Sequence, residues 1–275
     1  MNLHNHYLQK SFQSKSVLKI ITGINNINVN KVLKIAKAAE LSKATYLDVA
    51  ANVNLVKTLK VLCRLPICIS SINPVDMYNC VIAGADLVEI GNYDFFCNKG
   101  IYLTVKQIIN LSIEVKYLIR DIDICVTIPH YISLAEQVYL AQQLEFIGVN
   151  VIQTEGFSKC YEREYINSNT SILNSSNSFI PSLLSTYFIS KSVKIPVIAA
   201  SGCNNIFASL ANVYGAHGVG FGSSLQKQNN INSIIKYINQ AHKSLNSSMN
   251  SESLICLDKS IYPILRNKEI NILYN

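Results

Sequence analysis

The sequence predicts a single (β/α)8 barrel, and three observations support this fold. Eight short apolar segments alternate with eight amphipathic segments along most of the 275 residues. The apolar segments lack a strict apolar–polar alternation, which is typical of parallel strands buried on both faces. Barrels of this kind commonly hold about 250 residues in one domain, close to the length of this chain. An open, doubly wound sheet is the alternative fold.

The predicted strands form a repeating pair of types, which favours the barrel because alternate strands fill alternate layers of a barrel core. One type follows a helix and a turn of small residues; its members lie in Leu41–Ala51, Ala83–Asn92, Ile147–Gly156 and Tyr214–Ser223. The other follows a hydrophobic-Pro pair or an Asp; its members lie in Leu65–Pro74, Asp121–His130 and Lys194–Gly202. Val17–Ile24 supplies the remaining strand.

Helices are predicted between the strands, where apolar residues recur at spacings of three and four. The segments are Val32–Glu40, Val53–Cys63, Val75–Ala83, Val105–Leu118, Leu134–Ile147, Ile180–Ser190, Ile206–Val213 and Ile231–His242. Thr104 and Ser133 are residue types that cap a helix N-terminus, and Gly84 and Gly148 stand where a helix should end.

The barrel is expected over residues 17–244, after an N-terminal segment (1–16) and before a C-terminal extension (245–275). The N-terminal segment has no apolar stretch of the kind found in secretory signals. Phe157–Ser178 is too long for an ordinary loop and is expected to be a lid, a binding loop or a disordered insertion. The extension ends in an apolar stretch that we expect to dock on the barrel or on a neighbouring subunit.

Composition limits the classes of function. Hydrophobic residues make up 49% of the chain and charged residues 15%, which is ample for a large core, and no run of eighteen apolar residues predicts a membrane span. The net charge is +7, but the basic residues are scattered, which argues against nucleic-acid binding. The eight cysteines form no C-x-x-C pair, so buried, reduced thiols are expected rather than a zinc site.

Two glycine-rich turns after the last two strands predict an anion site, most simply for a phosphate. The candidate phosphate-binding residues are Ser201, Gly202, Gly220, Gly222 and Ser223. Glycines let backbone N–H groups approach an anion closely, and these two loops are where barrels frequently bind phosphate. The alternative is that the glycines only shape tight turns.

Four residues at strand ends are candidates for acid–base catalysis: Asp48, Glu89, His130 and Glu155. The three acids end even-numbered strands, so they could converge at one mouth of the barrel. The alternative is that they are solvated or salt-bridged rim carboxylates. Lys19 lies within the first strand, where a salt bridge inside or below the barrel is expected.

The cofactor stays unassigned. The sixth strand holds no lysine, which argues against a Schiff base there, and no G-x-G-x-x-G opens a helix. A flavin could still use the phosphate loops. No residue is assigned to a metal.

These segments resemble the Ycf23 family of algal plastids and cyanobacteria. The matching strings are KIITGINN from Lys19, ATYLDVAA from Ala44, LPICISSINP, AGADLVEIGNYD, VTIPH, VIQTEG and the two glycine turns. The resemblance implies a plastid location and a barrel related to phosphate-binding aldolase-like and isomerase-like proteins. It supplies no reaction.

Three hypotheses follow. The first is an enzyme that acts on a small phosphorylated metabolite by aldolase-, isomerase- or epimerase-type acid–base chemistry. The second is a non-catalytic sensor of such a ligand, with a protein partner or a second copy of the chain. The third is a scaffold protein with a vestigial site.

Overall fold

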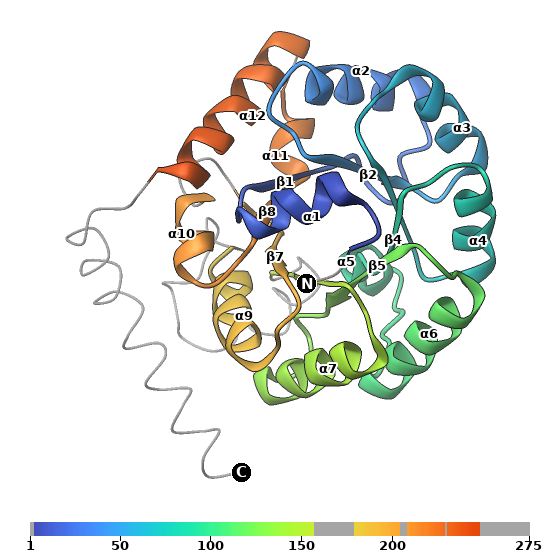
Figure 1. The fold of residues 1–275 in the computed structure, drawn as a ribbon, viewed down its shortest axis with the longest axis vertical. Coiled ribbons are helices and arrows are strands. Elements are labelled where there is room, and N and C mark those ends of the chain that lie inside the picture. Colours follow the sequence, from blue (N-terminus) through green and yellow to red (C-terminus); the bar gives the residue numbers. More distant parts are fainter. Residues whose placement is uncertain (1–2, 157–178, 204–207, 229, 248–275) are drawn as a thin grey trace.

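All eight predicted strands form in the computed structural model, which describes residues 3–156, 179–203, 208–228 and 230–247. They are β1 (Val17–Ile21), β2 (Tyr46–Ala50), β3 (Ile67–Ser71), β4 (Leu87–Ile90), β5 (Asp123–Ile128), β6 (Val151–Thr154), β7 (Val197–Ala199) and β8 (Gly218–Phe221). Neighbours pair in parallel in chain order, and β8 pairs with β1 to close the barrel (Figure 1). The barrel prediction is therefore confirmed.

Most of the helices surround the barrel in the order of the chain (Figure 1). They are α1 (His6–Gln13), α2 (Val29–Glu40), α3 (Val53–Leu62), α4 (Pro74–Ile82), α5 (Tyr93–Cys97), α6 (Val105–Leu118), α7 (Leu134–Ile147), α9 (Phe179–Ser192), α10 (Ala208–Val213), α11 (Ser223–Gln226) and α12 (Ile231–Asn246). Within the described residues, no helix is both long and apolar enough to cross a membrane. The predicted loop Phe157–Ser178 and the extension beyond residue 247 lie outside the described part.

The helix ends that were predicted from a capping residue are confirmed at Thr104, Ser133 and Gly148. Thr104 and Ser133 each form a capping box, with Gln107 and Glu136 as the reciprocal partners. Gly148 ends α7 in the left-handed conformation, at φ 88°. One start was misplaced: α2 begins at Val29, because the Asn28 side chain accepts from the N–H of Lys31 and caps the helix three residues earlier than predicted.

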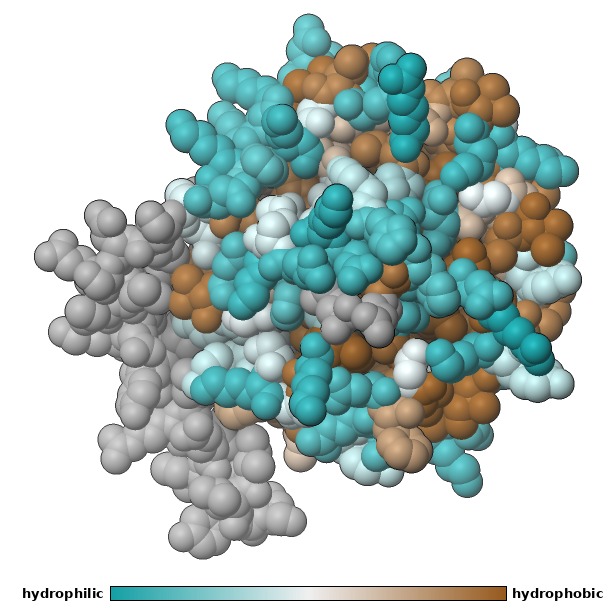
Figure 2. Space-filling model, viewed as in Figure 1, coloured by the Kyte–Doolittle hydropathy of each residue, from teal (hydrophilic) through white to brown (hydrophobic). Residues whose placement is uncertain are grey.

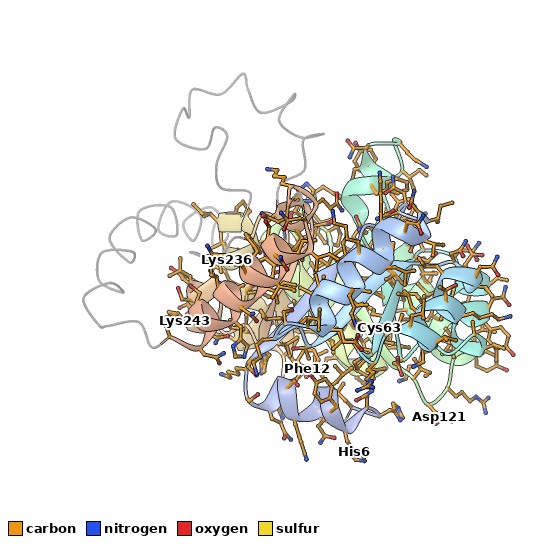
Figure 3. All side chains as sticks on the ribbon, turned by 90° about the horizontal axis from the view of Figure 1, so that it is seen from above. His6, Phe12, Cys63, Asp121, Lys236 and Lys243 are labelled. Carbon is orange, nitrogen blue, oxygen red and sulfur yellow. The ribbon has the colours of Figure 1, made fainter. Side chains whose placement is uncertain are left out.

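The N-terminal segment forms a structural element, α1, which covers the end of the barrel where the strands begin (Figure 1). Leu8 and Phe12 on α1 are fully buried against the apolar lowest layer of the barrel interior. In a side view, Phe12 lies on the side of α1 toward the barrel and His6 on the far side (Figure 3). The Asp123 carboxylate accepts from the N–H groups of His4 (3.0 Å) and Asn5 (3.3 Å), which fixes the start of the helix. Among the described residues, α1 leaves uncovered the opposite end of the barrel, where the strands end.

Candidate functional site

A lysine and two carboxylates are enclosed in the middle layer of the barrel. The Lys19 Nζ lies 3.0 Å from Asp48 Oδ2 and also bonds Glu89 Oε2. All three residues are at most 2% exposed. Burial alone would lower the pKa of Lys19, but Asp48 and Glu89 together raise it well above its usual range. The expected salt bridge of Lys19 is confirmed, and its ammonium stays charged at neutral pH.

Hydrogen bonds satisfy the rest of this buried layer. Ser70 donates to Asp48 at 2.6 Å, and Thr127 donates to Glu89 at 3.0 Å. Gln153 accepts from Lys19 (2.8 Å) and donates from its amide nitrogen to Glu89 (3.0 Å). Burial raises the pKa of Asp48 to about 6, against the opposing effect of Lys19. Asp48 and Glu89 thus neutralise Lys19 instead of projecting together into the barrel mouth with Glu155.

A hollow of about 280 Å³ lies above this layer, at the carboxyl ends of the strands. Its lining comes from the segments after β1, β4, β6, β7 and β8, and comprises Ile21, Gly23, Ile24, Asn25, Asn92, Phe95, Gln153, Glu155, Ala200, Ser201, Gly202, Cys203, Gly222, Ser223, Ser224 and Gln226. Gln153 belongs to both the hollow and the buried layer. Among these lining residues, Glu155 is the one with a charged side chain. The other polar side chains are amides, hydroxyls and a thiol.

Two turns at the hollow adopt unusual backbone conformations. Ser201 and the adjacent Gly202 both have φ of 69°, and Asn92 after β4 has φ of 65°. A positive φ is uncommon for a residue other than glycine and tends to occur at functional sites. Two of the four such residues in the described part of the chain line this hollow.

The turn after β8 leads directly into α11, a short extra helix. Gly222 is its N-cap residue, so no capping side chain covers the N–H groups of the first turn. The Ser224 hydroxyl donates to the Cys203 carbonyl at 3.0 Å, and the Gln226 amide donates to the Thr22 carbonyl at 3.2 Å. These two bonds join the loops after β7, β8 and β1 around the hollow. Ser223 lines the hollow beside them.

Of the five candidate phosphate-binding residues, the structure brings four together: Ser201, Gly202, Gly222 and Ser223. Gly220 lies one layer deeper and is not among the lining residues. A Cβ there would come within 3.0 Å of the Ala200 Cβ and 3.1 Å of Ile21 Cδ1. Close packing inside the barrel accounts for Gly220, which lies within β8 and not in a turn.

The remaining catalytic candidates, His130 and Glu155, lie next to each other. The His130 Nδ1 is 3.9 Å from Glu155 Oε2, and both side chains are less than one tenth exposed. Glu155 lines the hollow, whereas His130 is not among its lining residues. The four candidates therefore divide into a buried pair, Asp48 and Glu89, and an upper pair at the mouth.

Tyr93 is a residue at this end of the barrel that the sequence reasoning missed. It is 1% exposed, and its hydroxyl finds no hydrogen-bond partner among the described residues. Burial, with Tyr131, Glu155 and Glu89 nearby, raises the pKa of Tyr93 well above its usual range. A tyrosine directly after a strand end, in the string GNYD, was the available signal.

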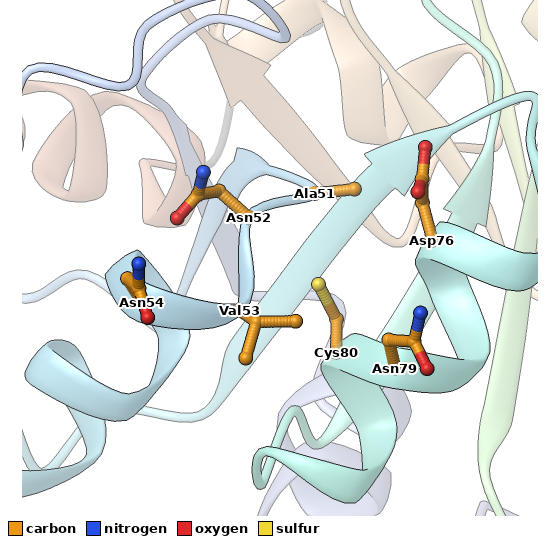
Figure 4. Close-up of a pocket in the computed structure, with 7 residues that line it drawn as sticks. All are labelled: Ala51, Asn52, Val53, Asn54, Asp76, Asn79 and Cys80. Atoms are coloured by element: carbon orange, nitrogen blue, oxygen red, sulfur yellow. The ribbon is translucent and has the colours of Figure 1, made fainter.

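A second hollow, of about 260 Å³, lies on the outer wall between the start of α3 and α4 (Figure 4). Asn52, Asn54, Asp76 and Asn79 line it, together with Ala51, Val53 and Cys80. The Asn52 side chain is already used to cap α3. Burial raises the pKa of Cys80 to about 11, so its thiol is protonated at neutral pH. The hollow at the strand ends is the stronger candidate, because the predicted loops converge there.

Solved structures with the same fold include enzymes of phosphorylated compounds. Thiamine phosphate pyrophosphorylase from Pyrococcus furiosus matches with a TM-score of 0.57 and 18% identity, over 85% of this chain and 96% of that one. (S)-3-O-geranylgeranylglyceryl phosphate synthase from Thermoplasma acidophilum, in complex with sn-glycerol-1-phosphate, matches with a TM-score of 0.57 and 12% identity, over 89% and 98%. At this identity the likeness shows the fold.

Sequence relatives are much closer. The family model described as protein of unknown function (DUF561) matches residues 3–251. The uncharacterized protein ycf23 of Antithamnion sp. is 47% identical over 280 residues, covering 100% of this chain and 95% of the relative. The ycf23 protein of Cyanophora paradoxa is 38% identical over 247 residues, covering 89% and 98%. The chain belongs to the Ycf23 family.

Proposed function

We propose that the hollow at the strand ends binds a small phosphorylated metabolite, and that Glu155 with His130 exchanges a proton with it. The observation that carries the proposal is the convergence of the two turns after β7 and β8 on one hollow, beside the short helix α11. Phosphate sites of (β/α)8 barrels are frequently built from these two loops and such a helix. Ser201, Gly202, Gly222 and Ser223 would hold the phosphate.

The size and chemistry of the hollow fit a small ligand. Pockets for drug-sized molecules hold roughly 300–1,000 Å³, and this one is at the lower limit, at about 280 Å³. Amide side chains of Asn25 and Asn92 also line the hollow. They suit hydroxyl or carbonyl groups on the body of the metabolite.

The charges favour acid–base chemistry over a Schiff base among the described residues. The Lys19 amine is a charged ammonium held by two carboxylates, so it lacks the free electron pair that a nucleophile needs. Glu155 faces the hollow and has an imidazole within 4 Å. Proton transfer of the aldolase, isomerase or epimerase type is the chemistry that this pair supports. A structural neighbour, N-acetylmannosamine-6-phosphate 2-epimerase from Clostridium perfringens, is by its name an enzyme of that class.

The relatives also support a location. The ycf23 relatives of this chain come from red algae such as Porphyra purpurea and Cyanidium caldarium, which are organisms with plastids. We propose that this protein likewise acts in the plastid.

Binding is tested by calorimetry on the full chain, with inorganic phosphate, sn-glycerol-1-phosphate and unphosphorylated glycerol as probes. We expect the phosphorylated probe to bind and glycerol not to bind. Ser223→Asp puts a negative charge into the proposed phosphate site and should weaken binding at least ~10-fold, which corresponds to about 1.4 kcal/mol. Asn54→Asp is the matched control, because it adds the same charge at the other hollow. Equal affinities of the two variants would contradict the phosphate assignment.

Chemistry is tested separately, by following deuterium exchange from D2O into bound sugar phosphates with NMR. Wild type should exchange a proton next to a carbonyl group, and Glu155→Gln should slow that exchange by about 10²–10⁴-fold while phosphate affinity is kept. Binding without any deuterium exchange would reject the catalytic half of the proposal and favour a non-catalytic sensor of the ligand.

A further inference from the structure

Three neighbouring helices on the outer wall of the barrel expose an unusual number of apolar side chains. The α3–α4–α6 face, as we name it, comprises Val61, Leu62, Val75, Tyr78, Ile82, Ile113, Tyr117 and Leu118. Val61 is 82% exposed, Tyr117 77% and Ile82 71%. Helix α4 lies between α3 and α6 and packs against both (Figure 1). Brown, hydrophobic surface appears in Figure 2 over the same part of the molecule.

The sequence of α4 departs from that of an ordinary surface helix. A helix that packs one side on a core normally carries charged or polar residues on the other. Met77 and Cys80 face the core, while Val75, Tyr78 and Ile82 recur on the solvent side at spacings of three and four. Asp76 is the one charged residue of the helix. The outward side of α4 therefore carries an apolar stripe, beside the exposed polar residues Asp76 and Asn79.

The extent of the face matches one half of a protein interface. From their fractional exposures, the eight residues, backbone and tyrosine hydroxyls included, expose on the order of 800 Å², whereas the largest apolar patch on a typical monomer covers roughly 300–600 Å². A standard stable interface buries about 800 Å² on each partner. Two copies of this face could together bury the area that a stable dimer needs.

The charges around the face are compatible with self-association. The Lys60 ammonium lies 3.0 Å from the Asp86 carboxylate, and the Lys116 ammonium bonds the Gly148 carbonyl at 2.7 Å. These two basic groups are thus engaged within the chain. The Arg120 guanidinium lies over the ring of Tyr117, 5.9 Å from its centroid, and the exposed Lys57 and Lys106 belong to α3 and α6. The chain carries a net charge of +7, but α4 contributes no basic residue to it. A contact centred on α4 therefore brings no basic residue of that helix against its copy.

We propose that the α3–α4–α6 face is the interface of a two-fold symmetric homodimer, with the two α4 helices packed against each other at the axis. In such an isologous contact the same surface serves both copies. The face lies on the side wall, so the hollow at the strand ends of each copy stays open. This proposal is independent of the proposed ligand and of catalysis.

The test is the mass of the full-length protein in solution, measured by sedimentation equilibrium between about 1 and 100 µM, a range that covers moderate dimer affinities. Wild type should have twice the 30.6 kDa of one chain. Val61→Asp and Ile82→Asp each place a charge in the apolar face and should weaken dimerisation at least ~100-fold, by burying an unpaired carboxylate. Phe146→Asp is the matched control, because Phe146 is 89% exposed on α7, outside the face. Circular dichroism and the melting temperature establish that each variant is folded.

Either of two results would overturn the proposal. Wild type that stays monomeric at 100 µM shows that the face does not bind a second copy. A dimer that Phe146→Asp dissociates as readily as Ile82→Asp, or that both face variants leave intact, shows that the interface lies elsewhere.

Discussion

Replacing Lys19 by Met tests whether the buried charges at the centre of the barrel form a structural unit. The substitution keeps an unbranched side chain, one atom shorter, and removes the ammonium that lies against Asp48 and Glu89. Removing one partner of a buried ion pair costs about 3–5 kcal/mol, because an uncompensated charge is left behind. Domains have a total stability of only about 5–15 kcal/mol. The variant should therefore be severely destabilised at neutral pH.

The loss should depend on pH with a defined sign. Burial raises the folded-state pKa of Asp48 to about 6, above its unfolded value, and Lys19 acts to lower it. Without Lys19 that pKa must rise further. A carboxyl group whose pKa is raised on folding contributes stability below its unfolded pKa and loses it as the pH rises through the folded pKa. The variant should thus be closer to wild type at pH 5 than at pH 8.

Urea denaturation at these two pH values measures the effect. With an m value near 3 kcal/mol/M for a barrel of this size, the loss lowers the urea midpoint by about 1 M or more at pH 8. A triple variant, Lys19→Met with Asp48→Asn and Glu89→Gln, removes all three charges and should recover much of the loss. A single variant that loses less than ~1 kcal/mol at pH 8 would refute the reasoning. So would an equal loss at both pH values, or a triple variant no more stable than the single one.

Three further predictions concern the scaffold. The pKa of His217 is lowered to about 4 by burial and by Lys15, and its Nδ1 accepts from the N–H of Val197 at 3.2 Å. The free energy of unfolding should therefore fall as the pH drops from about 6.5 towards 4. His217→Gln should flatten that part of a plot of urea midpoint against pH. Gly218→Ala should cost ~3 kcal/mol or more in unfolding experiments, because its Cβ would lie 2.4 Å from the Val17 carbonyl oxygen, whereas Gly222→Ala, with its nearest neighbour at 3.5 Å, should cost little. Ser133→Ala removes the cap of α7 and should lower the free energy of unfolding by about 1 kcal/mol; an unchanged urea midpoint would deny the cap a role in stability.

The barrel could be predicted from sequence because its signals are local. Each strand is a short buried run between turn residues, and Thr104, Ser133 and Gly148 mark helix ends by chemistry that acts within a few residues. The early start of α2 and the existence of α1 were missed. An asparagine caps each of these helices, Asn28 for α2 and Asn5 for α1. The capping role of such an asparagine is recognised from sequence only when a helix is already expected after it. The Ser/Thr caps were recognised because an obvious apolar repeat follows them.

The depth of each acid inside the barrel could not be predicted, because it depends on strand register. Asp48 and Glu89 occupy interior positions near the ends of β2 and β4, as Glu155 does after β6. The strands are staggered around a barrel; Ser70 pairs with Glu89, and Ala50, two residues beyond Asp48, pairs with Ser70. The strand register pairs residues about twenty positions apart in the chain, so no short stretch of sequence indicates which residues face each other. The sequence therefore predicts three acids at one mouth of the barrel without predicting that two of them lie deeper and bind Lys19.

The separation of charge between the two layers constrains how an anion could be recognised. In the described part of the chain, the full positive charge inside the barrel is that of Lys19, and two carboxylates already neutralise it. The hollow above offers hydroxyls, side-chain amides and backbone N–H groups at turns with positive φ. Such donors act over hydrogen-bond distances and in fixed directions, whereas a lysine or arginine attracts any anion from further away. If the proposed site holds phosphate, its selectivity then depends on how rigidly Ser224 and Gln226 hold the loops together, more than on net charge.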